Sequence, residues 1–205
     1  MSVAESGLRQ AAANNLTALS QRTAVVTAWV AAAVFVSACG DGKGKPDAMP
    51  DVPACSMQVT QYGAIQSFTQ TAANRTTDGS GKVTIAFLGA LGPGADADTL
   101  DIQLIQGMGA FAGGPPAAGT YQLTGAETQL STCGVCVVME AGMPRGYFAA
   151  QSGTLEITDV STMFQASLSN VVMAHVDVDP NTSVSTIVDT CTTSITSASW
   201  QTPIN

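Results

Sequence analysis

Four cysteines in the body of the chain are the residues with the clearest chemistry. They are Cys55, Cys133, Cys136 and Cys191. Cys133 and Cys136 have the Cys-x-x-Cys spacing of thiol–disulfide redox centres, which need a thiolate whose pKa is lowered by a helix N-terminus or a nearby cation. The residues that follow, Val-Val-Met-Glu at 137–140, are typical of a strand, and the nearest cation is Arg145. The sequence therefore favours a structural disulfide over a redox pair.

The four cysteines permit three connectivities, and the sequence does not choose among them. In a straight strand the Cα atoms of Cys133 and Cys136 would lie about 10 Å apart, beyond the roughly 7 Å limit for a disulfide. A bond between them needs a turn, which Gly134 could permit. We favour a Cys133–Cys136 bond, with Cys55–Cys191 joining the ends of the domain. One Cys-x-x-Cys pair with one histidine falls short of the usual zinc ligand set, so we expect no zinc site.

His175 is the only histidine of the chain. In a strand it lies on the face opposite the alternating apolar residues of 172–178, and it shares its own face with Asp177. Such a pair could be half of a catalytic arrangement, but no Gly-x-Ser-x-Gly motif accompanies it. We therefore expect a solvated surface histidine and no catalytic residues.

Three carboxylates, Asp96, Asp98 and Asp101, lie close together in the sequence. Carboxylates can gather on Ca²⁺, which takes about six to eight oxygen ligands. The segment lacks the EF-hand pattern, and Asp is in any case a favoured turn residue. A solvated acidic turn is the simpler interpretation, and the sequence indicates no cofactor.

The N-terminal residues have the order of a secretory signal. Residues 24–38 carry no charge and follow Arg22, and a basic segment before an apolar one is typical of export signals. The run is shorter than the about 20 apolar residues that a transmembrane helix needs. Residues 36–39, Val-Ser-Ala-Cys, begin within this run and match all four positions of the bacterial lipobox. By this motif the N-terminal segment resembles the bacterial lipoprotein family.

The resemblance implies cleavage before Cys39, so that residues 1–38 would be a lipoprotein signal peptide. It also implies a diacylglyceryl group on the Cys39 thiol and acylation of the new N-terminus, with chains such as palmitate. Several acyl chains anchor a protein far more firmly than one chain does. In Gram-negative lipoproteins an Asp directly after the cysteine favours the inner membrane. Gly40 stands there instead, so the outer membrane is expected.

Residues 39–54 form the expected lipid-anchored linker. The segment 40–53 reads GDGKGKPDAMPDVP and has almost no apolar side chains to bury. As a flexible chain it would span about 20 Å. The remaining residues, 55–205, are enough for one complete hydrophobic core.

The hydrophobic period in residues 55–205 is two, which indicates half-buried strands. Leu100, Ile102 and Leu104, for example, alternate with polar residues. The same alternation recurs in 83–87, 155–157, 164–168 and 172–178, and Gly, Pro and Asp clusters separate the runs. No segment sustains a capped helical pattern. The pattern predicts eight to ten strands in an all-β antiparallel sandwich or barrel-like domain, stapled by disulfides.

Charge is scarce, at 11% of positions with a formal net charge of −8. So few cations exclude a basic nucleic-acid binder. The sequence therefore predicts a lipid-anchored protein of the bacterial cell envelope, attached to the membrane by its N-terminal lipid, whose β-domain is structural or binding and not enzymatic. The alternative is an envelope thiol–disulfide oxidoreductase that uses Cys133 and Cys136. The sequence does not indicate which protein or glycan the domain binds.

Overall fold

The computed structural model describes residues 52–94 and 96–205, and the compact unit among them runs from Pro53 to Asn205. The signal peptide predicted for residues 1–38, the lipidation predicted at Cys39 and the part of the predicted linker up to residue 51 lie outside the described residues. Among the residues that are described, no helix is long and apolar enough to cross a membrane.

The unit is built from strands joined by short turns, which confirms the predicted all-β class. The strands are β1 (Gly63–Ile65), β2 (Gln70–Thr77), β3 (Val83–Ala90), β4 (Thr99–Ile105), β5 (Gly119–Gln122), β6 (Val135–Ala141), β7 (Gly146–Asp159), β8 (Met163–Val178) and β9 (Ser185–Pro203). Two short 3₁₀ turns, η1 (Gly109–Phe111) and η2 (Gly125–Thr128), lie between β4 and β6.

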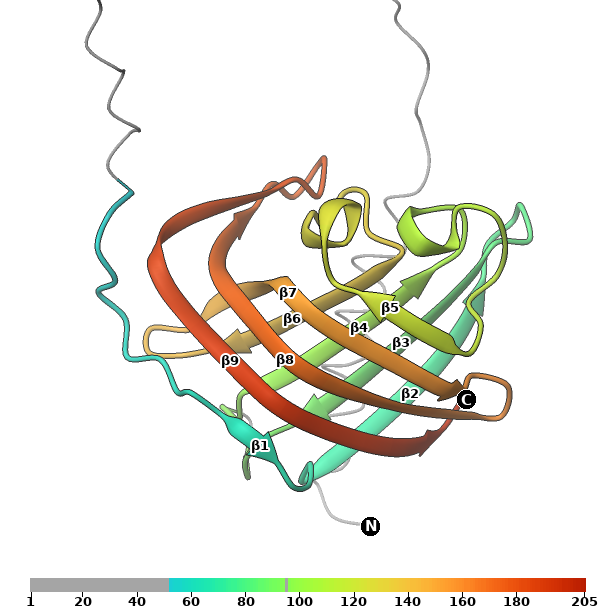
Figure 1. The fold of residues 1–205 in the computed structure, drawn as a ribbon, viewed down its shortest axis with the longest axis horizontal. Coiled ribbons are helices and arrows are strands. Elements are labelled where there is room, and N and C mark those ends of the chain that lie inside the picture. The colour runs from blue at the N-terminus through green and yellow to red at the C-terminus, as the bar shows by residue number, and fades with distance from the viewer. Residues whose placement is uncertain (1–51, 95) are drawn as a thin grey trace, which may run out of the picture. The chain divides into compact units, whose positions relative to one another are not determined.

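All nine strands belong to one curled sheet (Figure 1). Its order is β1-β9-β8-β7-β6-β4-β3-β2, with β5 added beside β7, and every pairing is antiparallel except that of β1 with β9. The sheet curls until β2 meets the chain's last residues. There the Arg75 N–H donates to the Asn205 carbonyl at 3.0 Å, and the Asn205 N–H donates to the Ala73 carbonyl at 3.1 Å. The curled sheet thus encloses its own core.

The alternation in the sequence places the core on one face of the sheet. On β4, Leu100, Ile102 and Leu104 are fully buried and the residues between them are partly exposed. On β8 the pattern shifts at Asn170, whose φ of 51° marks a break in the regular strand. After this break Val171 and Met173 are the residues packed in the core, whereas Val172 between them is 43% exposed. His175 therefore lies on the inner side of the sheet, which the sequence pattern did not reveal.

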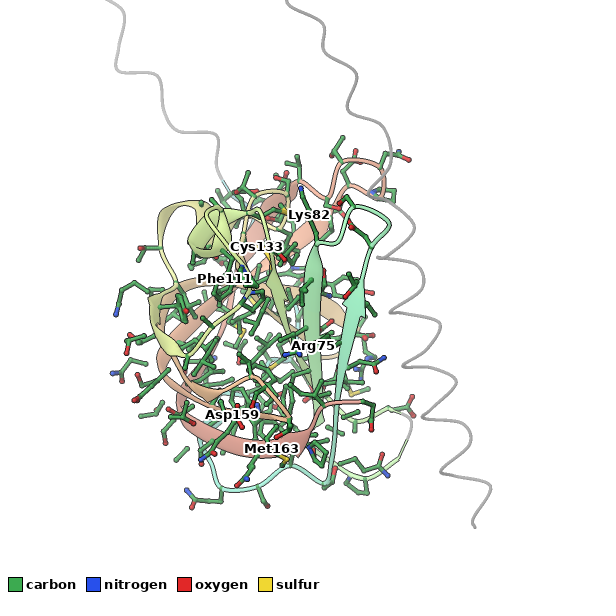
Figure 2. All side chains as sticks on the ribbon, turned by 90° about the vertical axis from the view of Figure 1, so that its right-hand side faces the viewer. Arg75, Lys82, Phe111, Cys133, Asp159 and Met163 are labelled. Atoms are coloured by element: carbon green, nitrogen blue, oxygen red, sulfur yellow. A yellow bond between two sulfur atoms is a disulfide. The ribbon has the colours of Figure 1, made fainter. Side chains whose placement is uncertain are left out.

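Side chains fill the inside of the curled sheet (Figure 2). Near β3, β8 and β9 they include a cluster of aromatic rings. Phe87 from β3 stacks on Trp200 from β9, with ring centroids 4.7 Å apart. Phe68 and Phe164 pack edge-on against both rings. Because β3 and β9 are separated by four strands in the sheet, these contacts hold its two halves together.

We expect Trp200→Ala to lower the free energy of unfolding by about 3–5 kcal/mol, the usual cost of removing a large buried aromatic side chain. Trp200→Phe should cost less, because it keeps a ring and removes an indole N–H that has no hydrogen-bond partner. Urea denaturation followed by circular dichroism measures both. Tyr147→Ala, at a side chain that is 51% exposed, is the control and should change stability by less than about 0.5 kcal/mol.

Candidate functional site

The structure pairs the four cysteines as the sequence analysis favoured. Cys55 bonds Cys191, with Cα atoms 4.6 Å apart, and Cys133 bonds Cys136, with Cα atoms 5.3 Å apart. The first bond joins residues 136 positions apart, and the second closes a turn at the start of β6. The two disulfides therefore have different surroundings, described in turn below.

The Cys133–Cys136 disulfide is buried, with 0% and 5% of the two residues exposed. Gly134 lies within the turn, as expected, and its backbone is not left-handed. A Cβ at Gly134 would lie 2.3 Å from the Met108 carbonyl oxygen and 2.8 Å from the Ala110 nitrogen. The backbone leading into η1 packs directly on this glycine, so the residue is required by close approach.

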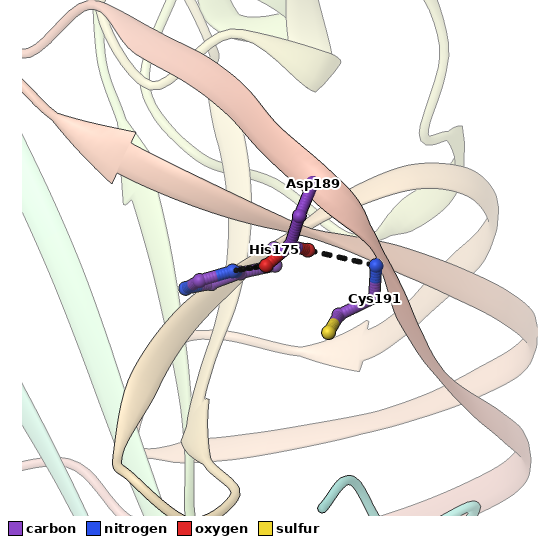
Figure 3. Close-up of side chains that lie close together, drawn as sticks. All are labelled: His175, Asp189 and Cys191. Carbon is purple, nitrogen blue, oxygen red and sulfur yellow. Dashed lines mark hydrogen bonds and ion pairs between the residues drawn. The ribbon is translucent and has the colours of Figure 1, made fainter. Parts of the chain in front are cut away.

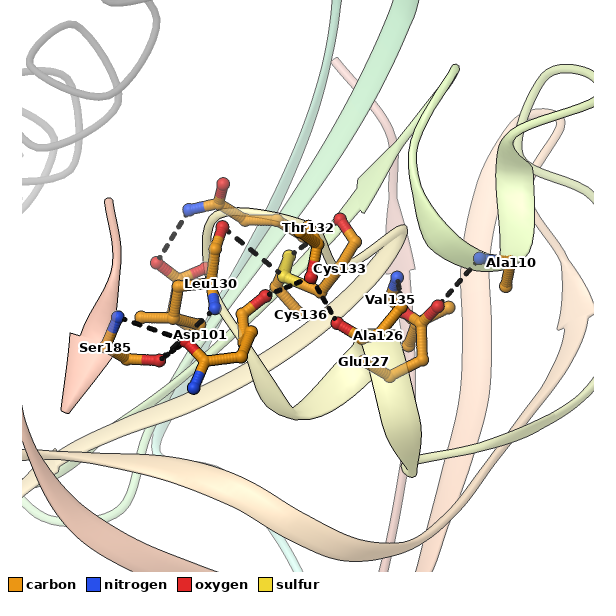
Figure 4. Close-up of a disulfide and its surroundings, with 12 residues drawn as sticks. Asp101, Ala110, Ala126, Glu127, Leu130, Thr132, Cys133, Val135, Cys136 and Ser185 are labelled. Carbon is orange, nitrogen blue, oxygen red and sulfur yellow. Dashed lines mark hydrogen bonds between the residues drawn. A yellow bond between two sulfur atoms is a disulfide. The ribbon is translucent and has the colours of Figure 1, made fainter. Parts of the chain in front are cut away.

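Glu127, in η2, is a buried carboxylate beside this turn (Figure 4). Its Oε1 accepts the Ala110 N–H at 2.7 Å, and its Oε2 accepts the Val135 N–H. The carboxylate thereby joins η1 to the first residue of β6. Both oxygens are occupied by backbone donors, so Glu127 supports the disulfide turn and leaves little room for another role.

The Cys55–Cys191 disulfide lies where the described chain first meets the sheet. Residues 53–62 run along β9: the Thr190 N–H donates to the Pro53 carbonyl, and the Cys55 N–H donates to the Thr190 Oγ1, each at 2.9 Å. Cys191 is buried, whereas Cys55 is exposed. Solvent therefore reaches this disulfide from the Cys55 side.

His175 lies next to this disulfide, opposite an irregular part of β9. Ala174 pairs with Thr192, and Val176 pairs with Ile187. Between these two pairs β8 has one residue, His175, and β9 has four, 188–191. A bulge of this kind bends the strand and redirects its side chains. It brings Asp189 against the imidazole, with the Asp189 Oδ2 2.8 Å from the His175 Nδ1 (Figure 3).

The His175 side chain is 18% exposed and that of Asp189 is 12% exposed. The expectation of a solvated surface histidine was therefore wrong, and Asp177 on β8 is not its partner. The reason is the shift at Asn170, which turns His175 inward to pack against Phe148, with ring centroids 5.3 Å apart.

His175, Asp189 and Cys191 form a compact group of potential metal ligands. Their ligand atoms all lie within 4.8 Å of one another, and no other such group occurs among the described residues. The second carboxylate oxygen of Asp189 accepts the Cys191 N–H at 2.7 Å, which fixes its orientation. The sequence analysis did not single out Asp189. The only available signal was its position two residues before Cys191, on the same strand face.

The three aspartates considered for Ca²⁺ are placed differently. Asp98 accepts a hydrogen bond from the Tyr62 hydroxyl, and Arg145 Nη1 lies 3.9 Å from the Asp98 Oδ1. Burial and the Asp98 carboxylate raise the pKa of Tyr62 well above its usual value. Arg145 also donates to the carbonyl of Asp96 at 2.7 Å. The arginine thus supplies the positive charge for this loop.

Asp101 is directed from β4 to the outer face of the sheet, where Gln103 donates to its carboxylate at 3.3 Å. Burial raises the pKa of Asp101 to about 6. A carboxyl that ionises less readily is a poorer ligand for a hard cation. The acidic segment is therefore less suited to metal binding than the His175 group.

Comparison of the chain with protein-family models, with curated protein sequences and with solved structures found no match. The functional argument consequently rests on the residues and geometry described above.

We expect Glu127→Gln to lower the free energy of unfolding by about 1–3 kcal/mol. An amide has one acceptor oxygen, so its NH₂ group would face a backbone N–H and leave that donor unsatisfied. Glu156→Gln is the matched control at an exposed position of β7. Urea denaturation of the two variants measures the difference, and equal stability of the two would contradict the assigned role of Glu127.

We expect limited reduction of the folded protein to open Cys55–Cys191 before Cys133–Cys136, because a reductant must reach a sulfur and only Cys55 is exposed. Brief treatment with a reductant, alkylation and peptide mapping would show the order. In concentrated urea the difference should shrink, which provides the control. Earlier labelling of Cys133 and Cys136 in the folded protein would contradict this prediction.

Proposed function

We propose that the chain is an exported, lipid-anchored protein of the bacterial cell envelope, placed at the outer membrane. Its domain has a structural or binding role and is not an enzyme. The observation that carries the proposal is the pair of disulfides in one small β-domain, because disulfides persist in oxidising compartments and are rare in the cytosol.

The position of the first disulfide supports a tethered domain. Cys55 follows the proline-rich and glycine-rich segment 40–53, and Cys191 holds the beginning of the described unit on β9. A force on the linker would therefore be transmitted to β9 through the Cys55–Cys191 disulfide. This arrangement suits a chain that is anchored by lipid at Cys39 and displays its domain at a distance.

The charge of the domain supports anchoring by lipid over electrostatic attraction. After residue 54 the sequence has three cations, Arg75, Lys82 and Arg145, against eleven acidic residues. Basic clusters are what attract proteins to anionic lipid headgroups, and three cations do not supply one. The charge of the domain therefore supports attachment through the acyl chains.

The buried Cys-x-x-Cys pair supports a structural role for that disulfide. Thiol–disulfide exchange requires that an attacking thiolate reach one sulfur, and redox cysteines are accessible. No observation on the structure favours the alternative of an oxidoreductase that uses Cys133 and Cys136, so the binding or structural role is the one proposed.

Lipidation is tested by expressing the full-length chain in a lipoprotein-processing bacterium supplied with a clickable fatty acid. We expect label on the wild-type protein and complete loss of label in Cys39→Ala, since the thiol is the acceptor. The double variant Cys55→Ser/Cys191→Ser is the matched control and should keep its label, because its lipobox is intact. Persistent labelling of Cys39→Ala would overturn the proposal.

A further inference from the structure

We propose that the dithiol form of the domain binds a zinc ion through Cys55, Cys191, His175 and Asp189. The disulfide and the metal site would be two alternative states of one cluster. This inference is independent of the lipid anchor, because it rests only on the arrangement of these four side chains (Figure 3 shows three of them).

The donor set suits Zn²⁺. Thiolate sulfur, imidazole nitrogen and carboxylate oxygen are its ordinary protein ligands, usually four in a tetrahedron. The ligand atoms of His175, Asp189 and Cys191 already lie within 4.8 Å of one another. The Cys55 Sγ is bonded to the Cys191 Sγ at 1.98 Å, so reduction would add a fourth ligand at the same place.

The histidine and the aspartate are nearly at ligand spacing. The His175 Nδ1 and the Asp189 Oδ2 lie 2.8 Å apart and are joined by a hydrogen bond. Two ligands on a tetrahedral zinc ion, each about 2.0–2.1 Å from the metal, stand about 3.3–3.4 Å apart. A zinc ion between these atoms therefore requires a shift of about half an ångström.

The surroundings would hold Asp189 in place when the metal binds. Its Oδ1 accepts the Cys191 N–H at 2.7 Å, and this bond does not involve the oxygen that would face the zinc. Hydrogen bonds of this kind to ligand side chains orient metal ligands in known sites. The β9 bulge that creates this arrangement positions Asp189 and Cys191 together.

The larger movement falls on Cys55. Two thiolates on a tetrahedral zinc ion stand about 3.8 Å apart, given Zn–S distances of about 2.3 Å. Cys191 is buried in β9, but Cys55 is exposed on the segment that leads into the sheet. Its sulfur can therefore move outward while the sheet keeps its form.

The chemistry balances with an external dithiol as reductant. Exchange with the dithiol breaks the Cys55–Cys191 bond and leaves two thiols, while the reductant becomes a disulfide and supplies both electrons and both protons. Zinc binding then releases the two thiol protons. Zinc takes the place of the hydrogen bond between the His175 Nδ1 and the Asp189 Oδ2, and the proton of that bond leaves for the His175 Nε2 or for solvent.

The second cysteine pair offers a built-in comparison. Cys133 and Cys136 belong to no group of three metal-ligating side chains in the described part of the chain. The buried carboxylate beside them, Glu127, already accepts two backbone hydrogen bonds. Reduction of this pair would therefore leave two thiols without the nitrogen and oxygen ligands that the other cluster has.

The test uses the full-length chain with Cys39→Ala, so that this thiol does not contribute, in its oxidised form and after reduction. We expect the reduced protein to bind one Zn²⁺ at least a hundredfold more tightly than the oxidised protein in a chelator competition. Co²⁺ in place of zinc should give sulfur-to-metal charge-transfer absorption. His175→Ala and Asp189→Ala should each weaken zinc binding at least tenfold.

Two variants serve as matched controls: Asp177→Ala, an exposed aspartate of β8, and the double variant Cys133→Ser/Cys136→Ser. Both should bind zinc as the parent does. Equal binding by Cys55→Ser/Cys191→Ser would overturn the proposal, as would unchanged affinity in His175→Ala and Asp189→Ala. If reduction unfolds the domain, zinc should restore the β circular dichroism signal, and failure to do so would also overturn it.

Discussion

The stacking of Phe87 on Trp200 is the contact on which the rest of the domain depends. A sheet of these strands, left open, would expose one apolar face to water. The aromatic rings draw β3 and β9 together across the inside, and the sheet can then bury that face against itself. The backbone bonds between β2 and the last residues complete the closure, but they are few and partly exposed. The apolar core therefore supplies most of the driving force for curling.

Closure also places the parts that carry chemistry. Because β9 is held along its length by β8, the segment 53–62 can lie along its other edge and bring Cys55 to Cys191. The bulge in β9 interrupts the pairing only opposite His175, and there three polar or sulfur-bearing side chains meet. At the other cluster, η1 and η2 cover the Cys133–Cys136 turn and make it part of the interior. One pair of cysteines is thus accessible and the other is sealed.

The strands could be predicted from sequence because burial of one face imposes a period of two, as at Leu100, Ile102 and Leu104. The cysteine pairing was favoured because Gly134 could permit a turn between Cys133 and Cys136, which left Cys55 and Cys191 to join the ends of the domain, and the structure has this pairing. The bulge could not be predicted, because it depends on the register between β8 and β9, and so the meeting of His175 with Asp189 was missed. The close packing that requires a glycine at position 134 could not be predicted either, because the backbone that approaches Gly134 comes from a segment more than twenty residues earlier. A single left-handed residue, Asn170, was enough to reverse the expected orientation of His175.

The meeting of β2 with the C-terminal residues has a consequence for the order of events during synthesis. Ala73 needs Ile204 and Asn205 as its partners, and Cys55 needs Cys191, so both ends of the described unit must be present before the sheet closes. Contacts between residues this distant in sequence form slowly, and a partly synthesised chain cannot yet form the closed core. The sheet therefore cannot close until residues 191–205 have been synthesised. A chain that crosses a membrane in extended form, as the proposed export requires, is helped by this delay, which follows from the topology of the sheet.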